Sequence, residues 1–165
     1  MNDTLLDSLS AQLGDLLLNE KMFIATAESC TGGGVAEIIT RTPGSSGWFE
    51  RGFVTYSNRS KHELLDIGTD ILEQHGAVSR EVAEAMVSGA IKNSQAQSGL
   101  AITGIAGPDG GSTDKPVGTV WIAWQIKNNG PVCKHFLFQG DRKQVRMQAC
   151  QEALQGLINL LSKIK

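Results

Sequence analysis

The chain has 165 residues, of which 41% are hydrophobic and 19% are charged. This length predicts one domain, and the composition suits a folded globular protein rather than a disordered one. The 15 lysines and arginines stand against 17 aspartates and glutamates, and the net charge of −2 argues against a general nucleic-acid-binding protein. The 19 glycines exceed the average share, and they cluster in two segments that carry the functional argument.

The cysteines and the first residues indicate a cytoplasmic protein. Cys30, Cys133 and Cys150 form no CxxC pair, and an odd number of cysteines fits a reducing compartment better than a disulfide framework. Cys133 lies beside His135, but two side chains on one side of a strand do not make a zinc site, so no metal is expected. The first residues lack the basic start of a signal peptide, and no apolar run approaches the roughly 18 residues of a membrane span.

The predicted elements alternate between helices and strands. Apolar spacing and turn residues predict, in chain order, helix 4–20, strand 22–27, helix 35–40, loop 42–47, strand 48–57, helices 60–67, 69–75 and 80–97, strands 100–104, 119–126 and 132–138, and a last helix after Asp141. Gly52 is expected to bend its strand, Gly76 to end one helix, and Ser79 and Asp141 to cap the helices that follow them. The turn at 128–130 predicts a hairpin. We therefore expect an α/β protein, a three-layer α/β/α single domain with a mixed sheet.

Two glycine-rich segments each follow a predicted buried strand. They read AESCTGGG at 27–34 and GIAGPDGG at 104–111. Helix N-termini bind anions through their free N–H groups, and open α/β sheets hold ligands in the loops after their strands. Neither segment matches the P-loop or the Rossmann pattern. The sequence therefore leaves two interpretations, a shared ligand cleft or two tight turns that pack helices on the sheet.

Further polar segments complete a set of motifs. AESCTGG is accompanied by PGSS.WF..G.VTYSN..K at 43–61, HGAVS at 75–79, TGIAGPDGG..DKPVGTVW at 103–121 and FxGDRxxVR at 138–146. Taken singly, a loop serine is a turn residue and a lysine in the first turn of a helix is a solvated surface group. Together, in this order and at this spacing over about residues 5–160, the motifs resemble the C-terminal domain of CinA-like proteins, most closely its stand-alone form.

The resemblance implies an enzyme that hydrolyses the amide of nicotinamide mononucleotide to nicotinate mononucleotide and ammonia, without a cofactor. A primary amide needs a nucleophile, a proton shuttle and donors to the oxyanion. The motif serine of the family falls on Ser46, the expected nucleophile, and its motif lysine on Lys61, the expected base. Ser29 and Thr103 match further catalytic positions that line the site. The implied substrate-binding residues are Thr31, Gly32, Gly33, Ser45, Tyr56, Asn58, Gly104, Gly107 and Arg142.

The assignment of Lys61 as a base requires a large pKa change. Lysine has an ordinary pKa near 10.4, so Lys61 must lose roughly 3 pKa units to act near neutral pH. Partial burial or a neighbouring cation, Arg142 or Arg146, would lower it, and either arginine would also suit the substrate phosphate. Cys30 is a weaker candidate nucleophile than Ser29, because neighbouring strand residues point to opposite faces and Cys30 is expected in the core.

Two other functions stay open. The first is a non-catalytic nucleotide-binding or regulatory domain that keeps the glycine loops. The second is a role linked to DNA, which the near-neutral charge and the lack of a basic, aromatic-studded face oppose. For the enzyme we expect a small-molecule partner, neither nucleic acid nor membrane, and by resemblance alone a homodimer.

Overall fold

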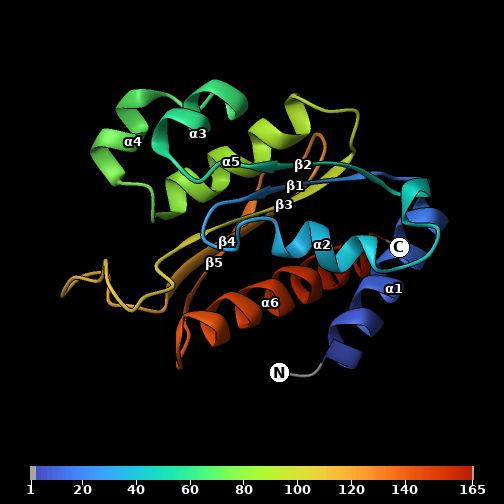
Figure 1. The fold of residues 1–165 in the computed structure, drawn as a ribbon. Coiled ribbons are helices and arrows are strands. Elements are labelled where there is room, and N and C mark those ends of the chain that lie inside the picture. Colours follow the sequence, from blue (N-terminus) through green and yellow to red (C-terminus); the bar gives the residue numbers. More distant parts are fainter. Residues whose placement is uncertain (1–2, 165) are drawn as a thin grey trace.

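The computed structural model describes residues 3–164, and its elements follow the expected order of helices and strands (Figure 1). They are α1 (Asp3–Glu20), β1 (Ile24–Glu28), α2 (Gly34–Thr40), the 3₁₀ helix η1 (Ser45–Gly47), β2 (Phe49–Val54), α3 (Asn58–Leu65), α4 (Thr69–His75), α5 (Arg80–Lys92), β3 (Ser98–Gly104), β4 (Thr119–Ile126), β5 (Val132–Leu137) and α6 (Arg142–Ser162).

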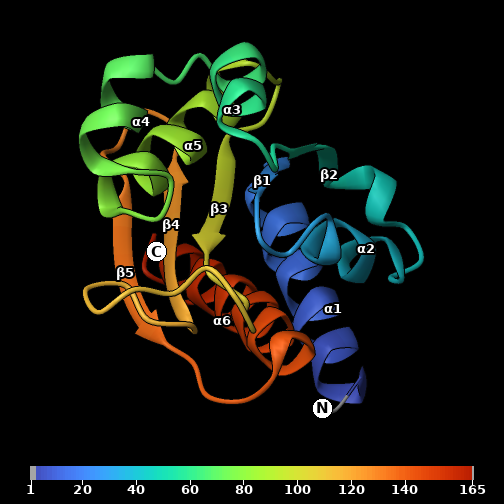
Figure 2. The same ribbon diagram turned by 60° about the vertical axis from the view of Figure 1, so that its left-hand side comes forward.

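The strands form one mixed sheet in the order β2-β1-β3-β4-β5. β1 pairs in parallel with both β2 and β3, whereas β4 is antiparallel to β3 and β5 is antiparallel to β4. The prediction of an α/β fold with a mixed sheet is therefore confirmed, including the hairpin. The carboxyl ends of the three parallel strands share one edge of the sheet, so the segments that follow them, 29–33, 55–57 and 105–118, begin at that edge (Figure 2).

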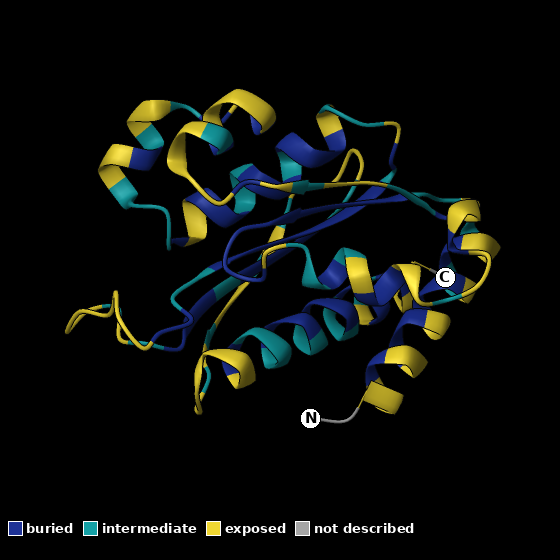
Figure 3. Cartoon of the chain, viewed as in Figure 1, coloured by how far each residue is buried: buried dark blue, intermediate teal, exposed yellow. Residues whose placement is uncertain are grey.

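Helices cover both faces of the sheet. Figure 1 shows α1, α2 and α6 on one side and α3, α4 and α5 on the other. Each side has its own apolar cluster, the first around Leu13, Ile38 and Leu157 and the second around Leu65 and Met86. Strand β1, which lies between β2 and β3, is buried along its whole length because helices lie on both of its faces, which gives the dark interior of Figure 3.

Local capping fixes where the long helices begin. The Ser79 hydroxyl accepts from the Val82 N–H at 3.2 Å at the start of α5. At the start of α6 the Asp141 carboxylate accepts from the Gln144 N–H at 2.9 Å, and the Gln144 side chain accepts from the Asp141 N–H at 2.8 Å. Both expected caps are confirmed, and Gly76 follows α4 with a φ of 76°.

Two predicted boundaries are wrong by three residues or more. The helix expected to reach residue 97 ends at Lys92, because the Asn93 side chain donates back to the Gly89 carbonyl at 2.9 Å and the Ser94 hydroxyl accepts from the Ala96 N–H at 3.2 Å. Such side-chain bonds to the backbone compete with helix continuation. The strand expected over 48–57 stops at Val54.

The irregularity in β2 also differs from expectation. The register between β1 and β2 shifts between the Ile24 and Ala25 pairs, at the start of β2 and not at Gly52. A Cβ at Gly52 would lie 2.8 Å from the Thr26 hydroxyl oxygen. Gly52 therefore serves close packing of the two strands.

Candidate active site

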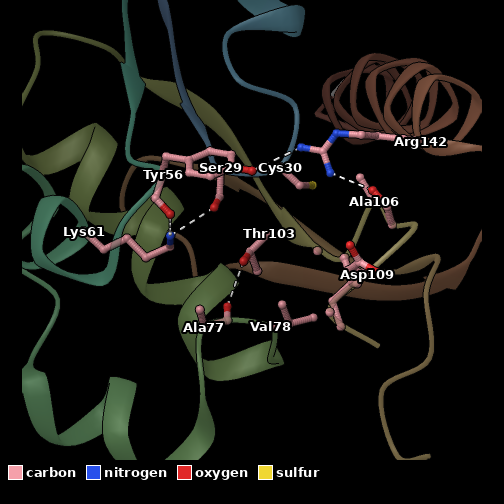
Figure 4. Close-up of a pocket in the computed structure, with 14 residues that line it drawn as sticks. Ser29, Cys30, Tyr56, Lys61, Ala77, Val78, Thr103, Ala106, Asp109 and Arg142 are labelled. Atoms are coloured by element: carbon pink, nitrogen blue, oxygen red, sulfur yellow. Dashed lines mark hydrogen bonds between the residues drawn. The ribbon is translucent and has the colours of Figure 1, made fainter. Parts of the chain in front are cut away.

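A pocket of about 270 Å³ lies beyond the carboxyl ends of β1 and β3 (Figure 4). It is walled by the segments after these strands, the turn between α4 and α5, and the first turn of α6. Seven residues expected in the site line it: Ser29, Tyr56, Lys61, Thr103, Gly104, Gly107 and Arg142. Residues from distant parts of the sequence thus meet at one concave place, as ligand sites in open α/β sheets do.

Ser29 and Lys61 form a buried pair at the inner end of this pocket. Lys61 Nζ donates to Ser29 Oγ at 3.0 Å, to the Thr55 carbonyl at 2.7 Å and to the Tyr56 carbonyl at 3.3 Å. Ser29 itself is held by its N–H, which donates to the Ile102 carbonyl at 3.0 Å. Only 1% of Lys61 and 8% of Ser29 is exposed, so bulk water hardly competes for the contact between them.

Burial changes the acid–base behaviour of Lys61. Removal of its ammonium from water lowers the pKa from 10.5 to about 8. The expected direction of the change agrees with the structure. Its cause is burial, whereas the sequence had left burial and a neighbouring arginine as alternatives.

Local sequence explains how a lysine in the first turn of a helix becomes buried. The Ser57 hydroxyl accepts from the Ser60 N–H at 3.0 Å and caps α3 three residues after β2 ends. The chain therefore turns into α3 at the carboxyl edge of the sheet. Lys61 then points inward to the end of β1 rather than into solvent, as Figure 4 shows.

Arg142 bridges the mouth of the pocket. Its Nη1 donates to the Gly107 carbonyl at 2.8 Å and its Nη2 to the Tyr56 hydroxyl at 3.1 Å. Figure 4 shows this guanidinium between the two contacts. A guanidinium has five N–H groups, so donors remain for an anion that enters the pocket.

Thr103 lies on the pocket wall opposite α6. Its hydroxyl donates to the Ala77 carbonyl at 2.8 Å and so ties the end of β3 to the turn before α5. Because that proton is committed to Ala77, the Thr103 oxygen is left as an acceptor on the pocket side.

The first glycine segment does not form the expected anion site. Glu28, which is 1% exposed, occupies the start of α2: its carboxylate accepts from the Thr31 hydroxyl at 2.7 Å and from the N–H groups of Val35 at 2.9 Å and Ala36 at 3.1 Å. Thr31 and glycines 32–33 are outside the residues that line the pocket. The protein's own carboxylate thus uses the donors that would attract a ligand anion.

Ser46 is not brought to the pocket. It lies exposed in η1, before β2, whereas Lys61 follows β2. The 6 residues of β2 separate them by roughly 20 Å at about 3.3 Å per residue, so within one chain Ser46 does not come within hydrogen-bond distance of Lys61. Ser45 lies with Ser46, and Asn58 lines a different hollow between α3 and α4, so neither belongs to this pocket.

Sequence reasoning missed half of the pocket wall. The additional lining residues are Cys30, Ala77, Val78, Ile105, Ala106, Asp109 and Gly110. The signal was present, because HGAVS and GPDGG were both recognised as motifs, but apart from Gly107 none of their residues was assigned a contact with substrate. Asp109 adds a negative charge to the wall of a pocket that also carries Lys61 and Arg142.

Cys30 and His135 give no sign of a second reaction centre among the described residues. Burial raises the pKa of Cys30 to about 12, which keeps the thiol protonated. His135 packs its ring on Trp121, with the centroids 4.8 Å apart. Within residues 3–164 no three His, Cys, Asp or Glu side chains gather in a way that could bind a metal ion, and no helix is long and apolar enough to span a membrane.

This fold and pocket define an α/β protein with a buried serine–lysine pair at the carboxyl edge of its sheet. Comparison with known protein families supports this description, because the family model of the CinA C-terminal domain matches residues 6–161 of the chain. The chain belongs to the CinA C-terminal domain family.

Individual relatives cover nearly the whole chain. It is 50% identical over 157 residues to "Nicotinamide-nucleotide amidohydrolase PncC" of Escherichia coli (strain K12), with 95% of each sequence covered. It is 51% identical over 153 residues to the protein of the same name in Pseudomonas putida, covering 93% of this chain and 95% of that one. The crystal structure of the competence/damage inducible protein CihA from Agrobacterium tumefaciens matches with a TM-score of 0.93 and 38% identity, covering 99% of this chain and 98% of that chain.

Proposed function

We propose that this protein hydrolyses the carboxamide of nicotinamide mononucleotide to give nicotinate mononucleotide and ammonia. The names of the relatives that are 50% and 51% identical support the reaction class and the substrate. We further propose Ser29 as the nucleophile and Lys61 as its base, in place of the pairing of Ser46 with Lys61.

The observation that carries the proposal is the set of partners around Lys61 Nζ. A neutral amine has two N–H groups and one lone pair. The carbonyls of Thr55 and Tyr56 accept two hydrogens, at 2.7 and 3.3 Å, so the lone pair is left for the Ser29 hydroxyl at 3.0 Å. A pKa of about 8 makes this neutral form accessible near physiological pH.

The reaction follows in two halves. Ser29 Oγ attacks the amide carbon while its proton passes to Lys61, and the lysine then donates that proton to the departing ammonia. The resulting ester on Ser29 is cleaved by a water molecule, whose proton again passes to Lys61, and the serine is regenerated with release of the carboxylate. Backbone N–H groups of the turn at 30–31, directly after Ser29, are the proposed donors for the oxyanion. No cofactor is needed for any of these steps.

Arg142 is proposed to hold the 5′-phosphate of the substrate. It borders the same pocket as Ser29 and keeps unused donors at the pocket mouth. Arginine binds phosphate through parallel charge-assisted hydrogen bonds, so the nucleotide would be anchored at one end with its amide near Ser29.

The resemblance to the family also suggests a homodimer and a cytoplasmic location. Both proposals rest on that resemblance. Light scattering coupled to size exclusion measures the mass of the particle in solution, and a monomer at micromolar concentration would reject the dimer.

Two serine variants test the assignment. Ser29→Ala should lower kcat for ammonia release by at least about 10³-fold while the protein still binds nicotinamide mononucleotide. Ser46→Ala, a matched change at an exposed serine, should keep nearly wild-type turnover. If Ser46→Ala is inactive and Ser29→Ala is active, the nucleophile is misassigned. Binding without any ammonia release by the wild-type protein would instead favour the non-catalytic nucleotide-binding domain.

A further inference from the structure

We propose that Arg146 is a positioning residue that holds the turn carrying Ser29 in its reactive geometry. The inference rests on the proposed role of Ser29. Arg142 and Arg146 lie four residues apart on α6, so one turn of the helix separates them. Arg142 borders the pocket, whereas Arg146 is outside its lining and reaches the chain just after Ser29.

The contacts of Arg146 are with neutral backbone oxygens. Its Nε donates to the Cys30 carbonyl and its Nη2 to the Thr31 carbonyl, both at 3.1 Å. The planar guanidinium thus holds two successive carbonyl groups with two donors of one rigid fork. Two neighbouring peptide planes cannot rotate independently while both bonds remain.

These two peptides form the centre of the turn. The Gly32 N–H donates to the Ser29 carbonyl at 3.0 Å, which closes a four-residue turn with Cys30 and Thr31 in the middle. On the other side of Ser29, its N–H is fixed to the Ile102 carbonyl on β3. The sheet therefore anchors the serine from one side and Arg146 anchors it from the other.

The direction of Ser29 Oγ depends on both anchors. Its contact with Lys61 is a single hydrogen bond of 3.0 Å. A displacement of the reacting group by about 1 Å lowers a rate by up to about 10²-fold. Loss of the Arg146 bonds should therefore reduce kcat, whereas substrate affinity, which we assign to Arg142, should change little.

Three alternatives for Arg146 predict different kinetics. A phosphate ligand would affect KM. A cation that lowers the pKa of Lys61 would shift the pH dependence of the rate, but burial already accounts for that pKa. A general stabilising contact would lower the melting temperature without a selective loss of kcat.

The kinetic test compares Arg146→Ala, Arg146→Lys and Lys143→Ala with the wild type on nicotinamide mononucleotide. Lys143 is an exposed cation on the first turn of α6, three residues before Arg146, and serves as the charge-matched control. Arg146→Ala should lose about 10²-fold in kcat, keep its KM and keep the midpoint of its pH profile. Arg146→Lys should recover only part of kcat, because it keeps the charge but loses the fork, and added guanidinium should partly rescue Arg146→Ala.

Four results would each overturn the proposal. In Arg146→Ala they are a change confined to KM, a shifted midpoint of the pH profile, or a wild-type kcat. In Arg146→Lys the result is full activity. A second readout does not need the reaction. Hydrogen exchange at the Gly32 amide, which closes the turn, should accelerate in Arg146→Ala and Arg146→Lys but not in Lys143→Ala. Unchanged hydrogen exchange at Gly32 in a folded Arg146 variant rejects the role of Arg146. A wild-type protein that releases no ammonia rejects the proposed function instead. The exchange measurement still tests whether Arg146 holds the turn, because it does not depend on the reaction.

Discussion

The buried lysine should make the stability of the protein depend on alkaline pH, and Lys61→Met isolates this effect. Burial lowers the pKa of Lys61 from 10.5 to about 8. At 1.36 kcal/mol per pKa unit, this difference corresponds to about 3 kcal/mol between the two protonation states. Methionine has a similar length and no charge, so the variant removes the titration and keeps most of the packing.

The direction in which the free energy of unfolding changes with pH follows from how many protons the folded and unfolded states bind. Below about pH 8 Lys61 is charged in both states, and the folded state carries the whole cost of burying the charge. Between about 8 and 10.5 the unfolded chain still binds the proton that the folded protein has released, so the free energy of unfolding rises with pH. Above 10.5 the group is neutral in both states and the cost is gone.

Urea unfolding of the wild type and Lys61→Met measures this change. The difference in unfolding free energy, wild type minus variant, should rise by about 3 kcal/mol from about pH 7 to about pH 11. Comparison with the variant removes the titration of all other groups, and Lys143→Met, at an exposed lysine, should show a flat difference from the wild type. A flat difference for Lys61→Met would refute the lowered pKa and with it the role of Lys61 as a base.

Four further predictions concern the site. Lys61→Arg should lose at least about 10²-fold in kcat, as Lys61→Ala does, because a guanidinium cannot accept the serine proton; an active arginine variant would show that only charge is needed. Arg142→Ala should raise KM for nicotinamide mononucleotide about tenfold or more and leave the riboside unaffected, and an equal effect on both substrates would contradict a phosphate contact. Activity should survive EDTA and iodoacetamide, since burial raises the pKa of the Cys30 thiol to about 12; inactivation against which substrate protects would contradict this. Asp109→Asn should lower kcat/KM for the cationic pyridinium nucleotide more than for an analogue with a neutral ring, whereas Asp114→Asn, in the same loop but outside the pocket lining, should not, and identical losses would reject a charge contact.

The order of elements could be predicted because each one has a local cause. The Asp141 capping box and the Ser79 cap are sequence patterns whose hydrogen bonds form within three residues. The end of α5 was missed because Asn93 and Ser94 act through their side chains, and helix periodicity gives no warning of that.

The nucleophile was harder to assign because it depends on which edge of the sheet a loop occupies. Ser29 follows β1, whereas Ser46 precedes β2, and both lie in polar segments beside strands. Once β1 and β2 are known to pair in parallel, the residue after one strand and the residue before the other must lie at opposite edges. The motif alone carried no information about that pairing.

The two glycine segments differ for a similar reason. Both follow a strand, but Glu28 at the end of β1 folds its carboxylate onto the start of α2, and the expected ligand anion has no place there. In the second segment the Gly107 carbonyl accepts from Arg142 at the pocket mouth, and the carboxylate of Asp109 lines the pocket instead of capping a helix. A glycine-rich turn therefore indicates a binding site only when the nearby side chains leave its donors unused.

Lys61 is buried, although lysine side chains are usually exposed to solvent. A lysine in the first turn of a helix should be solvated, yet this one is 1% exposed, and its partners among the described residues are carbonyl and hydroxyl oxygens. An acidic partner would have stabilised its charge and raised its pKa, which would have removed its use as a base. The protein therefore carries an unpaired buried amine at a cost to stability near neutral pH, and that cost is what makes the lone pair available to Ser29.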